Sequence, residues 1–188
     1  MFKSRFKVKE NVTYKVFDKD GNEKQLFQTH GFISWLIKKG LLSPFLPKIP
    51  VLFGFWSSEF NVSNLITNAG RGLISGLING SGTPAAATFI AVGTGTTAAA
   101  ATDTALQTET ATSGLSRAAG TVSLVTTTIT NDTAQVTKTF SVTGSVAVTE
   151  AGLLNASSVG TLLCRQVFSA INVANGDSLQ VTWKIQNA

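Results

Sequence analysis

The chain has 188 residues, of which 43% are hydrophobic and only 13% are charged, and its formal net charge is +5. This length allows one ordinary domain, or one domain with a small appendage, and the single cysteine, Cys164, excludes an intrachain disulfide. The charged share is about half of the usual ~25%. Such weakly charged surfaces are typical of proteins that bury them in permanent assemblies.

Charge and aromatic residues are concentrated in the first third of the chain. Residues 1–60 contain ten Lys and Arg against five Asp and Glu, whereas residues 61–188 contain five of each. Twelve of the sixteen Phe, Trp and Tyr residues also precede residue 61. The change in composition near Phe60 predicts a basic, aromatic-rich attachment segment over residues 1–60 and a second domain over residues 61–188.

The first elements in chain order are strands. Val12, Tyr14 and Val16 share one face by period-two spacing. The stretch 18–22 (DKDGN) then predicts a tight turn, because Asp-Gly supplies the positive φ that such hairpins need. Leu26 and Phe27 would lie on the return strand, so the N-terminal segment is expected to carry a β-hairpin extension.

A short helix over residues 31–39 and a proline-broken apolar segment follow. Three prolines between residues 43 and 50 forbid a regular helix there, and the apolar run 41–56 is too interrupted to span a membrane. Its large side chains need burial against the chain's own sheet or in a neighbouring subunit, with membrane contact as a third alternative. The candidate residues for a subunit interface are Phe45, Ile49, Phe53, Phe55 and Trp56.

The clearest helix is predicted over residues 64–79. Its apolar residues recur at intervals of three and four, which is the pattern of a helix with one buried face. Ser63 or Asn64 is expected to cap its start, and Gly80 its end.

The remainder of the chain is rich in Val, Thr and turn residues. Strands are predicted near residues 87–93, 121–130, 134–148, 162–169 and 178–185. Residues 93–105 are small and of low complexity, which predicts a loop. The expected fold is mainly β: an antiparallel sandwich, immunoglobulin-like or jelly-roll-like, with one or two short helices.

The residues that catalysis or metal binding would need are scarce. His30 is the only histidine and has no acidic residue or cysteine at ligand spacing. The stretch 93–97 (GTGTT) resembles a phosphate loop but lacks the Lys-Ser/Thr ending. We therefore expect no enzyme activity, no metal and no cofactor.

Glu150 is the carboxylate of most interest, because it lies in an apolar, strand-like stretch and would need a partner if buried. Arg117 and Arg165 are the candidate partners in a structural ion pair. A catalytic role for Glu150, with Asp103 as a second candidate acid in a hydrolase, is the alternative.

The basic residues of the N-terminal segment alternate with apolar residues. That pattern is typical of a solvated sheet face and contains no recognition helix, so contact with nucleic acid is possible but not favoured. No secretory signal opens the chain, so synthesis is expected in a bacterial cytoplasm.

Six short motifs follow one another along the chain, at residues 64–74, 91–97, 101–109, 149–156, 161–168 and 176–185. In this order they resemble a pattern found in structural proteins of tailed-phage particles. The resemblance covers about residues 62–188 and implies a virion protein of the tail, neck or capsid-associated type, which assembles with itself and with other virion proteins. It supplies no catalytic residues. A receptor- or glycan-binding appendage of the virion is the alternative.

Overall fold

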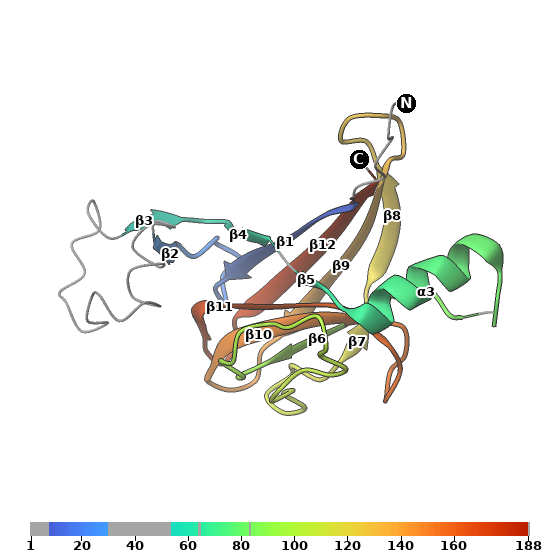
Figure 1. The fold of residues 1–188 in the computed structure, drawn as a ribbon. Coiled ribbons are helices and arrows are strands. Elements are labelled where there is room, and N and C mark those ends of the chain that lie inside the picture. The colour runs from blue at the N-terminus through green and yellow to red at the C-terminus, as the bar shows by residue number, and fades with distance from the viewer. Residues whose placement is uncertain (1–7, 30–53, 64, 83, 188) are drawn as a thin grey trace, which may run out of the picture.

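The computed structural model describes residues 8–29, 54–63, 65–82 and 84–187. Two antiparallel five-stranded sheets pack together as a β-sandwich, with the helix α3 (Asn68–Asn79) at one side (Figure 1). The predicted mainly-β sandwich is confirmed. Within the described ranges, no helix has the length and apolar character needed to cross a membrane.

The first sheet joins the N-terminal strand to the C-terminal strand. β1 pairs with β12 along its whole length, from Val8 opposite Asn187 to Phe17 opposite Ser178. The predicted boundary near Phe60 therefore does not separate the two sheets, since β1 belongs to the sandwich. The strands, in sheet order, are β4 (Phe60–Ser63), β1 (Val8–Phe17), β12 (Ser178–Asn187), β9 (Thr133–Ser141) and β8 (Thr121–Val125).

The second sheet has two short edge strands and three longer central ones. Residues 134–148, predicted as one strand, form parts of two, because the chain turns at Gly144 and passes from β9 in the first sheet to β10 in the second. The strands, in sheet order, are β5 (Leu65–Ile66), β11 (Leu162–Val173), β10 (Val146–Leu154), β6 (Phe89–Gly93) and β7 (Ala118–Ala119).

The predicted N-terminal hairpin is present only at its turn and in the first pairs beyond it, where Phe17 bridges Glu23 and the Lys24 N–H donates to the Val16 carbonyl. Asp18 Oδ1 accepts hydrogen bonds from the backbone N–H groups of Asp20 and Asn22, and Gly21 has a φ of +83°. The return strand β2 (Leu26–Thr29) pairs instead with β3 (Gly54–Ser57) in a separate two-stranded sheet. The physical reason is that β12 and β4 already occupy both edges of β1.

The helix α3 begins four residues later than predicted. Residues 65–66 form β5, with Ile66 opposite Cys164 on β11, so Asn64 cannot cap the helix. Thr67 is the N-cap instead, and its Oγ1 accepts a hydrogen bond from the Gly70 N–H at 2.9 Å. Gly80 ends the helix in the left-handed conformation, as predicted.

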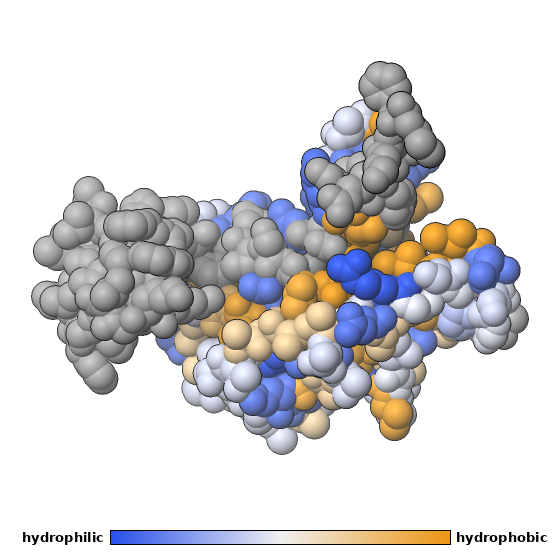
Figure 2. Space-filling view, viewed as in Figure 1, coloured by the Kyte–Doolittle hydropathy of each residue, from blue (hydrophilic) through white to orange (hydrophobic). Residues whose placement is uncertain are grey.

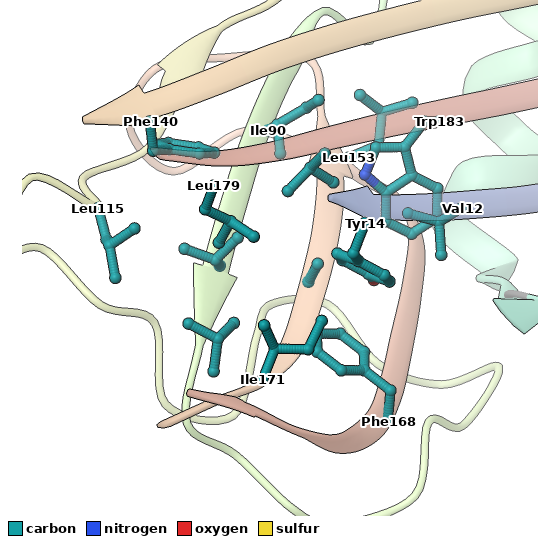
Figure 3. Close-up of a cluster of buried hydrophobic side chains, with 14 of the residues drawn as sticks. Val12, Tyr14, Ile90, Leu115, Phe140, Leu153, Phe168, Ile171, Leu179 and Trp183 are labelled. Atoms are coloured by element: carbon teal, nitrogen blue, oxygen red, sulfur yellow. The ribbon is translucent and has the colours of Figure 1, made fainter. Parts of the chain in front are cut away.

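The main core lies between the two sheets and contains four aromatic side chains, Tyr14, Phe140, Phe168 and Trp183. Trp183 and Tyr14 are completely buried on the first sheet, and the Tyr14 ring lies 4.3 Å from the Phe168 ring, centroid to centroid (Figure 3). Burial raises the pKa of Tyr14 well above its ordinary value, with a smaller contribution from Cys164. Aliphatic residues such as Ile90 and Leu153, from the second sheet, complete this layer.

Candidate functional site

The buried acidic residue Glu150 lies on the side of the second sheet that faces away from the first. A β-bulge separates it from Val148, and beyond the bulge Ala151 belongs to the main core. Glu150 therefore shares the outer face with Leu154. The chain between β6 and β7 covers this face and places Leu106 in a small apolar cluster with Leu154.

The Glu150 carboxylate has no solvent exposure, and five N–H groups surround it. Three come from the backbone of the covering segment: Gly95 at 3.1 Å, Gln107 at 3.0 Å and Thr108 at 2.6 Å. The other two come from Arg165, whose Nε and Nη2 each lie 2.8 Å from Oε2. A buried carboxylate is tolerated when paired and hydrogen-bonded in this way.

Arg165 extends these contacts to a second acidic residue. Its Nη1 lies 2.8 Å from Asp103 Oδ2, and its Nη2 donates to the Thr97 carbonyl at 3.1 Å. Desolvation raises the pKa of Asp103, but the hydrogen bond from the Ala100 N–H and the charge of Arg165 outweigh it, so the pKa lies below its ordinary value. Glu150, Arg165 and Asp103 together are called the Glu150 network.

The Gly-Thr-Gly stretch that resembled a phosphate loop surrounds the carboxylate of Glu150 instead. A Cβ atom at Gly95 would overlap Glu150 Oε1, and one at Gly93 would lie 2.7 Å from the same oxygen. Thr149 donates its hydroxyl to the Gly95 carbonyl at 2.9 Å. The glycines allow the backbone to approach an internal anion closely, which is the physical role that glycines have in true phosphate loops.

Arg117, the other candidate partner of Glu150, pairs with a different residue. Its guanidinium binds Glu109 through two contacts, Nε at 2.9 Å and Nη2 at 2.6 Å. Its Nη1 donates to the carbonyl groups of Ala156 and Val159 in the turn between β10 and β11. Arg117 therefore stabilises that turn, and the interpretation of Arg117 as a partner of Glu150 is wrong.

Glu109 is an ion-pair partner that was not predicted from the sequence. It lies eight residues before Arg117, and its bridge to Gly93 places it beside β6. Its closeness to Arg117 in sequence was a usable signal. Nothing local favoured Arg165 over Arg117 as the partner of Glu150, because that choice depends on the register between β10 and β11, in which Arg165 lies opposite Gly152.

The Glu150 network is suited to stabilising the fold. A catalytic acid must come within hydrogen-bond reach of a substrate, whereas the covering segment encloses Glu150 and its backbone binds both carboxylate oxygens. Among the described residues, no group of three or more His, Cys, Asp or Glu side chains is arranged to hold a metal ion. The geometry therefore assigns the network to holding the covering segment on the sheet.

A second candidate surface is the outer face of the first sheet, which is polar and mostly uncharged. Thr13, Thr182, Thr137 and Thr121 lie opposite one another on four neighbouring strands. The hydroxyl groups of Thr137 and Thr182 are 3.1 Å apart. Neighbouring rows on this face present Gln, Ser and Lys side chains. The threonine face, as we call the row of four threonines, is a regular array of hydroxyl groups.

The candidate interface residues lie mostly beyond the described structure. Phe45, Ile49 and Phe53, like the helix predicted over residues 31–39, are outside the described residues. Phe55 and Trp56 lie in β3, opposite Gln28 and Phe27 of β2. Their role as a subunit interface stays a prediction.

No family model, curated protein or solved structure matches the chain. The functional interpretation therefore depends on the chain's own geometry. Four of the six motif stretches named in the sequence analysis meet around the Glu150 network. They are joined there by contacts among Gly95, Asp103, Thr108, Thr149, Glu150 and Arg165.

Proposed function

We propose that the chain is a non-enzymatic structural subunit of a tailed-phage particle. In this proposal it assembles with itself and with neighbouring virion proteins at the tail, the neck or a capsid-associated position. The proposal is supported by the observation that four of the six motif stretches meet in the buried Glu150 network, where their polar groups bind one another. Such a motif supports a structural role, because it maintains a fold without presenting reactive groups.

The composition of the chain also supports assembly. Only 13% of the residues are charged, and large apolar side chains are exposed on α3, on β8 and in two turns. Apolar residues that a monomer leaves in water are covered when subunits pack together. Proteins of this kind usually associate with a closed symmetry.

The apolar segment before residue 57 is the proposed contact with a neighbouring subunit. Phe45, Ile49, Phe53, Phe55 and Trp56 would supply its buried side chains, since the aromatic and aliphatic residues at the centre of an interface carry most of the binding energy. Replacing Phe45 and Ile49 together by Asp is expected to abolish incorporation into particles. A folded variant that still enters particles would contradict this role.

Labelling of particles tests the proposed function. An antibody against the purified chain, detected with gold, is applied to particles released by the bacterium that carries the gene. The expected result is gold at one fixed position on tailed particles. Recovery of the chain only in the particle-free fraction would overturn the proposal.

A receptor- or glycan-binding appendage is the second candidate function, and the threonine face favours it. Hydroxyl and amide groups on four neighbouring strands offer hydrogen-bond donors and acceptors that match those of a carbohydrate. The row includes Thr137 and Thr182, which are both partly exposed.

A glycan array separates this candidate from a purely structural role. Binding by the unmodified chain, and its loss in a Thr137→Val, Thr182→Val variant, would support the appendage. Val keeps the β-branched shape of Thr and replaces the hydroxyl group by a methyl group of similar size, so the fold is expected to remain. An array without bound glycans would remove the candidate.

A further inference from the structure

The edge strand β8 has the features of an unprotected pairing surface. It is the last strand of the first sheet, and its sequence, TVSLV, contains no charged residue, proline or glycine. Natural proteins usually protect such edges with charges, prolines or bulges, because an open edge pairs readily with another chain. The two edge strands of the second sheet, β5 and β7, are only two residues long, whereas β8 has five residues.

The apolar side chains of β8 lie on the inner face of the first sheet but are not covered. Val122 is opposite Val136, which is buried in the main core, and Leu124 is two residues further along the same face. Even so, Val122 is 58% exposed and Leu124 is 63% exposed. The inner face of the sheet thus extends beyond the part that the second sheet covers.

The sequence of β8 is self-complementary about its central residue. In an antiparallel pair centred on Ser123, Val122 of each copy lies opposite Leu124 of the other, and Thr121 lies opposite Val125. The apolar pair then falls on the inner face, and Thr121 continues the polar outer face. In this arrangement Ser123 lies opposite Ser123 of the second copy. Opposite residues of an antiparallel ladder form either a hydrogen-bonded or a non-hydrogen-bonded pair, and a two-fold axis can pass through a pair of either kind.

We propose that β8 pairs antiparallel with β8 of a second copy of this chain, about a two-fold axis through Ser123. The two five-stranded sheets then form one continuous ten-stranded sheet. This pairing rests on the proposed function, which includes self-association, and adds to it the contact that joins two copies. A second copy is the favoured occupant because the strand carries no charge and its two inner-face residues, Val122 and Leu124, lie opposite each other in the pair.

The helix α3 adds a second apolar surface on the same side of the joined sheet. It contacts β11 of the second sheet, and Ile74 packs against the main core, whereas Leu77 is 45% and Ile78 is 77% exposed. Figure 2 shows hydrophobic surface along the upper side of α3, next to the part of the molecule that projects upward in this view. The two-fold axis, perpendicular to the sheet, keeps both helices on the inner side with the apolar residues of β8.

A cysteine at the proposed axis tests the register. Opposite residues in an antiparallel pair have Cα atoms about 4.5–5.5 Å apart, within the limit of about 7 Å for a disulfide. Ser123→Cys is therefore expected to give a covalent dimer under mild oxidation. Thr121→Cys is the matched control, since four residues along the strand separate its two copies by about 13 Å. Cys164, the native thiol, is buried.

Selective cross-linking of Ser123→Cys supports the proposed pairing. No cross-link at Ser123, or equal cross-linking of Thr121→Cys, overturns it.

The mass of the chain in solution, measured by analytical ultracentrifugation, separates this inference from the proposed function. Val122→Lys with Leu124→Lys is expected to lower the mass by disrupting the edge, while Val159→Lys, an exposed apolar residue in a turn, leaves it unchanged. An unchanged mass in the β8 variant overturns the pairing but leaves self-association intact. A monomeric unmodified chain overturns both. A cooperative thermal unfolding transition verifies that each variant is folded, since the unfolding temperature itself falls when copies dissociate.

Discussion

Glu150 is a charged residue whose environment accounts for its burial. Five N–H groups bind its two oxygens, and Arg165 supplies the opposite charge. Its burial was foreseeable from the apolar stretch around it, but its partner was not. Arg117 and Arg165 are equally plausible from sequence, and only the register of β10 and β11 distinguishes them.

Removing the charge of Glu150 is expected to destabilise the fold strongly. Glu150→Gln leaves Arg165 buried with only Asp103 as a charged partner, and breaking a buried ion pair costs about 3–5 kcal/mol. Denaturant unfolding measures the loss. Glu109→Gln is the control, because its pair with Arg117 is partly exposed and is expected to contribute only about 1 kcal/mol. Equal losses in the two variants would contradict the role of the Glu150 network.

The glycine beside the carboxylate gives a second prediction. Gly95→Ala places a Cβ atom against Glu150 Oε1 and is expected to lower the free energy of unfolding by about 1–3 kcal/mol. Gly72→Ala is the matched control, since a Cβ atom there meets nothing within 4 Å and helix propensity favours Ala by about 1 kcal/mol. If Gly95→Ala were as stable as the unmodified chain, the close approach would have no energetic role.

Acidic pH should weaken the turn between β8 and β9 through Asp132. Desolvation raises the pKa of Asp132, but the N–H groups of Ile129, Thr127 and Thr128, with the Gln186 side chain, outweigh it and hold the pKa far below its ordinary value. A lowered pKa in the folded state contributes stability that is present above the unfolded pKa of about 3.9 and is lost as the pH falls below it.

Unfolding measured from pH 6 to pH 2 should therefore show a smaller loss of stability in Asp132→Asn than in the unmodified chain. Parallel pH profiles would contradict this assignment.

At the scale of elements, locally encoded features were predictable and long-range pairings were not. The end of α3 at Gly80 and the strands near residues 89–93 and 178–187 follow from local patterns. The start of α3 was missed because residues 65–66 pair with β11. The basic composition around β1 led to the prediction of a separate N-terminal segment. The pairing of β1 with β12 could not be inferred, because composition does not indicate contact with a strand about 170 residues away.

The N-cap of α3 gives a prediction at this scale. The hydroxyl group of Thr67 accepts from the Gly70 N–H and donates to the Leu162 carbonyl at 2.6 Å, so it joins the helix to β11. Thr67→Ala is expected to cost about 1–2 kcal/mol of unfolding free energy. Thr67→Ser keeps both hydrogen bonds and should recover most of that loss. Equal destabilisation by Ala and Ser would assign the effect to lost packing of the methyl group instead.

At the scale of the whole molecule, the protein is a β-sandwich with exposed apolar residues that a second copy could cover. The Glu150 network holds the covering segment on one side, and the exposed edge β8 lies at the end of the other sheet. The fold class was predictable from the alternation of strands and turns. The uncovered inner face at β8 was not predictable, because sequence does not show how far one sheet extends past another.

The molecular mass of the unmodified chain in solution shows directly whether the chain associates with itself. Sedimentation equilibrium over a wide range of concentrations should give a mass that is a multiple of the 19.7 kDa of one chain. An even multiple is expected if β8 forms the two-fold contact. A constant mass of 19.7 kDa at every concentration would contradict self-association of the chain.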